Sequence, residues 1–411
     1  MPPKDSAIRP HAQPLLARGA YPLLLAGAFL VYAAANAPVP VATELRSAAG
    51  LDGSDAALFL LPFAVGFGAG TLAWLAVARH RAPRAVLPAS LGLMAAATVP
   101  ALLVPAPAAT VASRVAVGLA AAGYPAVAQS AITRAAAPGR RGRLIGGFVM
   151  AVVAGSFVGQ ALVGGLAQMA GARAALATVC VAAPLAAAAL LWRSLSRSPA
   201  AGRPEAAAPG AGEGIARVVR RQWPVLTVAL LGFGGYWLLL SRLPVALRDE
   251  RFHLTAAEAG ALPAIGLLGV ATAWFAGRAA DRVGQRLPMT VTLATGIAGL
   301  AVTLPAGTPL WAFAAGYGVF LAAYWGYLPP ASAEVAARSS AHDRQPALMA
   351  LYAAMWTGAA VAPALGAALH GWTAAALAAG AAWAIAAAVA ATTFTAPRRT
   401  LSLVPRSEGA P

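Results

Sequence analysis

The chain has 411 residues, of which 60% are hydrophobic and 10% are charged, and its mean hydropathy is +0.70. A soluble globular domain carries about 25% charged residues, so the composition excludes that class of protein. The formal net charge of +17 is typical of nucleic-acid-binding proteins, but the placement of the basic residues indicates a membrane protein without a nucleic-acid partner.

Apolar runs of about 20 residues recur along the whole chain, and each is long enough to cross a hydrocarbon core of about 30 Å. We therefore expect an all-α integral membrane protein with twelve transmembrane helices. The expected spans are 21–44, 56–78, 85–105, 108–133, 143–168, 173–193, 223–246, 258–279, 287–305, 309–333, 346–369 and 372–394. No A-x-A-like cleavage site precedes the first span, so we expect it to be retained in the mature protein.

Basic residues gather in alternate connections between the spans. If both termini are cytoplasmic, the inner segments hold 24 of the 30 Lys and Arg residues, the outer segments hold five, and Arg114 lies within span 108–133. This distribution follows the positive-inside rule for an even number of spans. We expect a multi-pass protein of the plasma (inner) membrane with both termini in the cytoplasm. The ratio of 29 Arg to one Lys indicates a GC-rich bacterial genome.

Residues needed for several other chemistries are scarce. Cys180 is the single cysteine, which excludes an intrachain disulfide, and the five histidines form no i, i+4 ligand pair. No Gly-x-x-x-x-Gly-Lys-Ser/Thr loop that could cradle phosphates is present. We therefore expect no metal, no cofactor and no enzymatic activity, with energy drawn from a gradient or a partner.

The two halves of the chain repeat each other. Arg79 stands 202 residues before Asp281 (281 − 79), and Gly155 stands 203 residues before Gly358 (358 − 155). Duplicated six-helix halves are the organisation of many secondary transporters. The expected parts are an N-terminal tail at 1–20, a six-helix bundle at 21–193, a flexible linker at 194–222, a second six-helix bundle at 223–395 and a C-terminal tail at 396–411.

A short charged hairpin lies between the eighth and ninth expected spans. It contains Gly277, Asp281, Arg282, Gly284 and Arg286. The spacing resembles the G-x-x-x-D-R-x-G-x-R signature of the major facilitator superfamily, a large group of secondary transporters. The resemblance implies two pseudo-symmetric six-helix bundles and a cytoplasmic gate at this hairpin.

In that family the acid of the hairpin faces the N-terminal end of a helix in the opposite half, which here is span 143–168. The partial positive charge of a helix N-terminus stabilises a carboxylate, and Arg143 is a further expected partner of Asp281. The matching loop of the first half departs from the family, since Arg79 and Ala82 stand where an acid and a glycine are expected. The resemblance therefore implies a gate that is weaker or rests mainly on Asp281.

Two motifs inside the spans extend the resemblance. Arg114-x3-Gly118 resembles the family's R-x-x-x-G motif, which implies a role for Arg114 in proton coupling. The alternative is an arginine that reaches to the lipid headgroups.

The second motif lies in span 143–168. Gly146-x8-Gly155-x3-Gly159-Gln160 resembles the antiporter motif of the twelve-spanner drug/metabolite:proton antiporter group, with Gln160 in place of a proline. The alternative is close helix packing through small residues.

Aromatic and polar residues at mid-depth offer flat apolar faces with polar edges, which suit a cavity for an aromatic or amphiphilic ligand. The expected cavity residues are Tyr32, Asn36, Phe67, Gln160, Tyr236, Trp237, Tyr324, Trp325, Tyr352 and Trp356. No acid lies at the middle of a span, which favours a neutral or anionic substrate over a strongly cationic one. Arg114 is the expected counter-charge.

These features favour a secondary active transporter that moves a small organic molecule by alternating access, above all by proton-coupled efflux of a drug or metabolite. One alternative is a proton-linked uptake permease for a small organic anion or nutrient, which the altered first-half loop and Gln160 keep open. Another is a non-transporting membrane sensor on the same scaffold. The expected partners are the substrate, protons and membrane lipid, and we expect a monomer.

The topology is testable with reporter fusions. Fusions at residues 52, 107 and 250 should report the outside, and fusions at residues 82, 140 and 210 should report the cytoplasm, because the arginines are concentrated in the inner segments. An inside signal at residue 250 would contradict the arrangement of six spans on each side of the linker.

Overall fold

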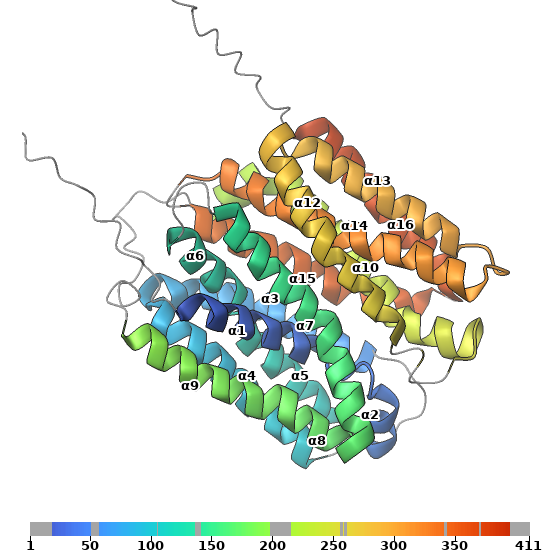
Figure 1. Cartoon of the computed structure of the whole chain (residues 1–411), viewed down its shortest axis with the longest axis horizontal. Coiled ribbons are helices and arrows are strands. Elements are labelled where there is room, and N and C mark those ends of the chain that lie inside the picture. The colour runs from blue at the N-terminus through green and yellow to red at the C-terminus, as the bar shows by residue number, and fades with distance from the viewer. Residues whose placement is uncertain are drawn as a thin grey trace, which may run out of the picture.

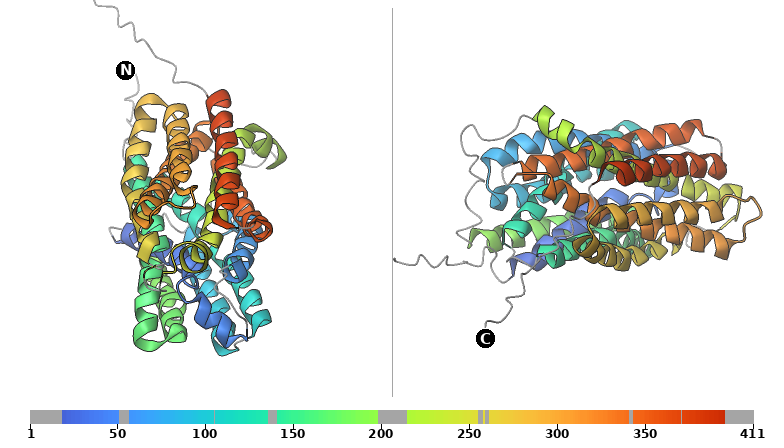
Figure 2. Two further views of the ribbon diagram at one scale, coloured as in Figure 1. Left: turned by 90° about the vertical axis from the view of Figure 1, so that its right-hand side faces the viewer. Right: turned by 90° about the horizontal axis from the view of Figure 1, so that it is seen from above.

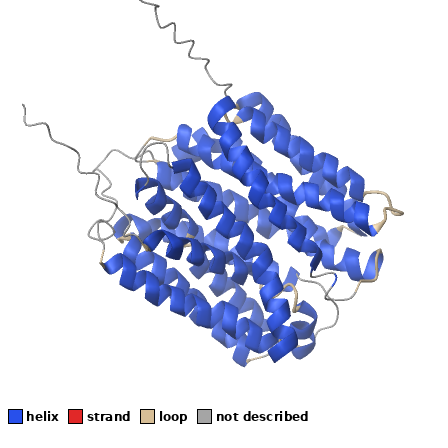
Figure 3. Ribbon diagram, in the orientation of Figure 1, coloured by secondary structure: helices blue, strands red, loops and turns tan. Residues whose placement is uncertain are grey.

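The computed structural model describes residues 19–50, 57–104, 106–135, 141–197, 215–254, 258, 261–340, 343–369 and 371–394. Every regular element among these residues is a helix, and none of them is in a strand (Figure 3). The expected tail at 396–411, residues 1–18 of the expected tail at 1–20 and most of the expected linker at 194–222 lie outside the described residues.

Two sets of helices follow each other along the chain. The first half contains α1 (Ala20–Asn36), α2 (Ala42–Ala48), α3 (Ala57–His80), α4 (Pro83–Leu103), α5 (Pro107–Ala121), α6 (Pro125–Ala135), α7 (Arg141–Ala170), α8 (Ala172–Ala177), η1 (Thr178–Ala182) and α9 (Ala183–Ser196). The second half contains α10 (Ile215–Val245), η3 (Ala246–Glu250), η4 (Leu262–Leu267), α12 (Leu268–Val283), α13 (Arg286–Thr303), α14 (Leu310–Ala337), α15 (Arg344–Ala368) and α16 (Gly371–Thr393).

Each of the twelve expected spans overlaps one helix or a run of consecutive helices. Within the described parts of the chain, nine helices are long and apolar enough to cross a membrane. The apolar helix α1 and the apolar part of α3 (Leu58–Trp74) are shorter. The 28 residues of α14 provide the length of a span, but its Trp, Tyr, Gly and Pro residues make it less apolar.

Prolines divide two of the expected spans. The first span is expected as one helix over 21–44, but α1 stops at Asn36 and α2 starts at Ala42. Pro38 and Pro40 have no N–H group to continue the helical hydrogen bonds, so the chain breaks where they occur. The span 108–133 is divided in the same way, because α5 ends before the turn that leads into Pro125 of α6.

The second half starts earlier than expected. The helix α10 begins at Ile215, so residues 215–222 of the expected linker are helical. Arginine, alanine and glutamine in this stretch are good helix formers, so the helix begins before the apolar span.

The two halves lie side by side. Figure 1 shows the blue-to-green half below the yellow-to-red half, and the left view of Figure 2 shows the same separation from another direction. Within the first half α1 packs along α7, and within the second half α10 packs along α15. Between the halves, α3 packs along α15 and α7 contacts α12.

Equivalent glycines make a close backbone contact in each half. A Cβ atom on Gly155 of α7 would collide with the carbonyl oxygen of Phe29 in α1. A Cβ atom on Gly358 of α15 would collide with the carbonyl oxygen of Leu230 in α10. The repeat seen in the sequence therefore corresponds to the same backbone-to-backbone packing in both halves, which small residues permit in membranes.

Replacing these glycines tests the packing. Gly155→Ala and Gly358→Ala should each destabilise the protein by about 1–3 kcal/mol, because overpacking forces the paired helices apart. Thermal unfolding of the purified protein in detergent measures the change. Gly165→Ala in α7 is the matched control, since no atom lies within 4 Å of the added Cβ. Equal midpoints for all three variants would contradict close packing at Gly155 and Gly358.

Candidate functional site

A cavity of about 820 Å³ lies between the two halves. This volume is in the range of about 300–1,000 Å³ that is usual for sites of small organic ligands. Helices α6 and α7 of the first half and α12, α14 and α15 of the second half form its walls. The lining residues are Gln129, Ile145, Gly146, Val149, Ala273, Trp274, Gly277, Arg278, Ala280, Asp281, Pro329, Ser332, Ala333, Ala336, Arg344 and Leu348.

The cavity reaches inward from one end of the bundle, which we call the arginine-rich end because Arg278, Arg282, Arg286 and Arg344 lie there. Along α12 the lining runs from Asp281 near the helix end to Ala273, a distance of about 12 Å at 1.5 Å per residue. By the sequence-based topology this end is cytoplasmic.

The expected gating hairpin forms part of the cavity mouth. Gly277 and Asp281 line the cavity from α12, and Gly277 lies against Pro329 of α14. Gly284 ends α12 with a φ of +79°, a left-handed conformation that favours glycine, and its N–H donates to the carbonyl of Ala280 at 3.1 Å. Arg282 and Arg286 are exposed on either side of this turn. The glycine spacing of the motif thus has a local structural cause.

Asp281 is exposed and makes no ion pair or hydrogen bond with any side chain that the structure describes. The side chain of Arg143, its expected partner at the start of α7, lies outside the described residues. In this conformation the cavity separates the end of α12 from α7. The gating role of Asp281 remains a prediction about the closed state.

Arg114 is buried, with 7% of its surface exposed, and all three of its guanidinium nitrogens donate to backbone carbonyls. Nη1 donates to Ala34 at 2.9 Å, Nη2 to Ala35 at 2.6 Å, and Nε to Phe59 at 2.9 Å. The guanidinium carbon also lies 4.7 Å from the centre of the Phe63 ring. Arg114 therefore connects α5 to both α1 and α3.

The break after α1 explains why these carbonyls accept from a side chain. Pro38 has no N–H to donate to Ala34, and the N–H of Val39 donates to Asn36 at 3.0 Å and leaves Ala35 free. Gly118 of the same motif lets α5 approach α3, because a Cβ there would collide with the carbonyl of Phe63.

Arg114 does not line the 820 Å³ cavity. Beside it is a cavity of about 50 Å³ that Arg173 and Cys180 also line, which has room for a few water molecules. The guanidinium turns inward instead of reaching to headgroups, and its hydrogen bonds brace the helices. A role in proton coupling remains a prediction.

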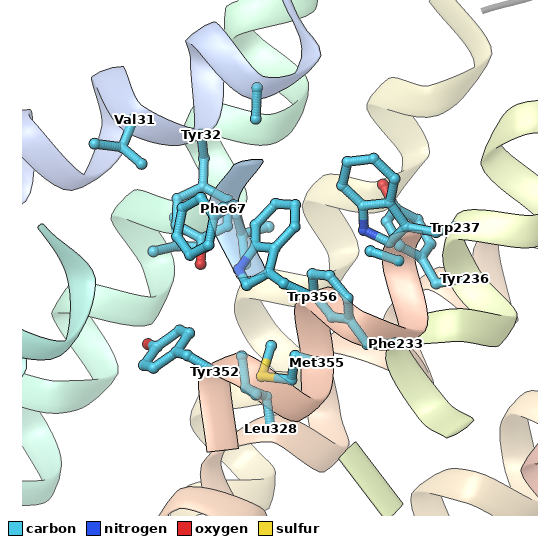
Figure 4. Packing of buried hydrophobic residues seen from close by; sticks show 14 of the residues in the cluster. Val31, Tyr32, Phe67, Phe233, Tyr236, Trp237, Leu328, Tyr352, Met355 and Trp356 are labelled. Carbon is cyan, nitrogen blue, oxygen red and sulfur yellow. The ribbon is translucent and has the colours of Figure 1, made fainter. Parts of the chain in front are cut away.

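Trp356 of α15 lies at the centre of the interface between the halves (Figure 4). Its ring stacks on Phe67 of α3 with centroids 4.1 Å apart and meets Phe63 edge-on at 5.4 Å. Tyr32 of α1 lies 6.4 Å away, and Phe233 and Trp237 of α10 lie 5.2 Å and 5.1 Å away. These rings leave Trp356 with 1% of its surface exposed.

A second group of rings continues the contact. Tyr236 of α10 stacks on Tyr324 of α14 at 4.1 Å, Tyr324 meets Trp325 at 4.8 Å, and Trp325 meets Phe157 of α7 at 6.3 Å. We call the two groups together the aromatic layer: Tyr32, Phe63, Phe67, Phe157, Phe233, Tyr236, Trp237, Tyr324, Trp325 and Trp356. Trp325 stands one helical turn deeper than Pro329 of the cavity wall, so this layer lies deeper in the bundle than the cavity, and none of its residues lines the cavity.

None of the ten expected cavity residues lines the 820 Å³ cavity in this conformation. Asn36 and Gln160 are buried and donate to carbonyls of their own helices, at Tyr32 and Ser156. Tyr352 is buried one turn deeper than Leu348. The other expected residues are buried within the aromatic layer, where they face one another.

The glycines of the α7 motif have different surroundings. Gly146 lines the cavity and has no atom within 4 Å of a built Cβ. Gly155 and Gly159 instead lie against Phe29 and Ala33 of α1. Gly155 and Gly159 therefore allow α7 to pack closely against α1, whereas Gly146 faces the open space of the cavity.

Sequence reasoning missed several polar and aromatic residues of the cavity, namely Gln129, Trp274, Arg278, Ser332 and Arg344. The arginines were counted only as topology signals. The available signal was their position within one or two turns of helix ends at the same side of the membrane.

Two further acids near the arginine-rich end have structural partners. Glu334 accepts from Arg338 Nε at 2.6 Å, and Arg338 also donates to the carbonyl of Thr393 at 3.1 Å. This pair joins the ends of α14 and α16. Asp343 accepts from the hydroxyl of Ser340 at 2.7 Å, which holds the turn before α15.

Comparisons with known proteins agree with this architecture. The family model described as Major Facilitator Superfamily matches residues 24–357. None of the curated proteins matches the chain in sequence. Among solved structures, the chain is similar to a bacterial homologue of the human lysosomal transporter Spinster, crystallised in an inward-facing and unoccupied conformation. The TM-score is 0.62 at 18% identity, over 90% of this chain and 93% of that chain. The expected fold class is confirmed.

The bracing role of Arg114 is testable by substitution. Arg114→Ala should lower the thermal unfolding midpoint, because the carbonyls of Ala34 and Ala35 lose their donors and each buried unpaired group costs about 1–3 kcal/mol. Arg114→Lys should recover only part of the loss, since an ammonium lacks the planar fork that spans three carbonyls. Wild-type stability together with lost transport in both variants would instead assign Arg114 to coupling.

Proposed function

Because the chain belongs to the major facilitator superfamily, we propose that it works as a proton-coupled exporter of a small organic molecule. The family and the helical fold make it a multi-pass membrane transporter. The observation that supports the proposal is the cavity between the halves, which has Asp281 at its mouth at the arginine-rich end and has the aromatic layer deeper in the bundle beyond it.

This arrangement corresponds to one of the two states that alternating access needs. A molecule enters the cavity from the arginine-rich end, in the proposed topology from the cytoplasm. Release on the other side requires Trp356 to separate from Phe63 and Phe67. It also requires α12 to approach α7, so that Asp281 faces the start of that helix.

Proton coupling needs groups that exchange protons as the halves move. Among the described acids near the arginine-rich end, Asp281 lines the cavity and is free of partners, whereas Glu334 is held by Arg338. The proposal therefore assigns Asp281 to the gate whose movement is coupled to protons, and it keeps Arg114 as the candidate coupling residue. It further places the protein in the plasma membrane as a monomer, with its termini in the cytoplasm.

Inverted membrane vesicles test the coupling. Respiration acidifies their lumen, so an exported compound should drive protons out and relieve the quenching of acridine orange. Asp281→Asn should lower this response about fivefold, since about 1 kcal/mol of stabilisation of the closed gate is lost. Glu44→Gln, an exposed acid of α2 at the opposite end of the bundle, is the matched control.

Comparing right-side-out with inverted vesicles distinguishes export from import. Accumulation of the compound in right-side-out vesicles with an inward proton gradient, and no response in inverted vesicles, would identify an importer. An equal response from wild type and Asp281→Asn would contradict the role of the hairpin.

A further inference from the structure

The charges on the cavity wall are predominantly positive. Arg278 of α12 and Arg344 of α15 line it, and the acid among its lining residues is Asp281. Asp281 and Arg278 are both exposed, so water screens both charges, whereas Arg344 is half-buried. An anion in this cavity would therefore meet opposite charge at Arg344, and a cation would meet charge of its own sign there.

Arg344 carries an unused donor. Its Nε atom is shielded from solvent and has no hydrogen-bond partner among the described residues. A shielded donor without an acceptor is costly, so a residue that keeps one on a cavity wall is suited to an acceptor supplied by a ligand. The hydroxyl of Ser332 lies on the same cavity wall.

The remaining wall is apolar and has one aromatic face. Trp274 lines the cavity from α12, and the guanidinium of Arg278 lies 4.4 Å from the centre of its ring. Ile145 and Val149 of α7 and Leu348 of α15 complete the apolar wall. A flat apolar body fits this surface, while the arginines hold a charged group.

Further hydrogen-bond donors without partners lie deeper in the bundle than the cavity. The indole N–H groups of Trp237, Trp325 and Trp356 are buried in the aromatic layer without hydrogen-bond partners among the described residues. Indole nitrogen donates and does not accept. When this layer opens, an acceptor-bearing molecule finds partners there. Among the described residues, the unpaired oxygens near the layer are Oδ1 of Asn36 and the hydroxyl of Tyr327, whose ring lies 5.9 Å from that of Tyr324.

We propose that the substrate is an amphipathic organic anion with a flat apolar body. Its acidic group accepts hydrogen bonds from Arg344, and its body lies along Trp274 and the apolar wall of α7. This proposal rests on the proposed function, because it assigns the substrate of the transporter. It replaces Arg114 as the expected counter-charge, since the nitrogens of Arg114 already donate to carbonyls.

Binding to the full-length protein in lipid nanodiscs tests the proposal. Isothermal titration would compare three probes of one shape: 2-naphthalenesulfonate, the neutral 2-naphthamide and the cationic 2-naphthylmethylammonium. The sulfonate should bind at least about tenfold tighter than the cation. Arg344→Gln should weaken sulfonate binding by about tenfold to a hundredfold, which corresponds to one charge-assisted hydrogen bond.

Three variants separate charge from structure. Arg344→Lys should recover part of the sulfonate affinity, because it keeps the charge and loses the fork. Trp274→Ala should weaken all three probes alike. Arg193→Gln, which removes an exposed arginine of α9 outside the cavity lining, should leave all affinities unchanged.

Several results would overturn the anion site: no sulfonate binding, a cation that binds as tightly as the sulfonate, or full sulfonate affinity in Arg344→Gln. Counterflow of labelled probes in proteoliposomes tests transport separately. Sulfonate binding that depends on Arg344 without counterflow would contradict the transporter and support the site. Counterflow of the cation alone would support the transporter and contradict the site.

Discussion

The contact between Trp356 and the rings around it is the interaction on which the rest of this structure depends. Between helices in lipid there is no strong hydrophobic driving force, so specific packing must hold the two halves together. Trp356 meets Phe63 and Phe67 of the other half at 5.4 Å and 4.1 Å. Each aromatic pair contributes about 0.5–1.5 kcal/mol beyond burial. A few such pairs hold the halves together beyond the inner end of the cavity. Their total energy is small enough for a ligand that binds the two states with different affinity to overcome.

Contacts inside each half are of another kind. Gly155 and Gly358 bring backbone directly against backbone, and Arg114 ties three helices by hydrogen bonds. Such contacts do not adjust to small displacements, because a carbonyl or a glycine cannot change rotamer. Ring contacts between the halves can repack by rotation of side chains. The difference lets each half move as a unit while the interface between the halves changes.

Local patterns were sufficient to predict the helices and the repeat. Hydropathy located the spans, and the spacing of Gly155 and Gly358 located equivalent packing positions. The cavity was less predictable, because an aromatic residue at mid-depth can face a ligand or another ring, and only the tertiary packing decides between these. In the same way, the sequence shows Arg344 only as one of the basic residues of an inner segment, and the tertiary packing shows that it lines the cavity. The partners of Arg114 are carbonyls of α1 and α3, and those of Ala34 and Ala35 are free because the helix breaks at Pro38.

The hydrogen bonds of Arg114 also constrain the order in which the protein can be completed in the membrane. The carbonyls of Ala34 and Ala35 emerge from the ribosome 80 and 79 residues before the arginine that satisfies them. An unsatisfied backbone group in hydrocarbon costs several kcal/mol. The end of α1 must therefore keep access to water or lipid headgroups until α5 has been synthesised. Although α1 is the first described helix to be made, it cannot reach its final state before α5 has been made.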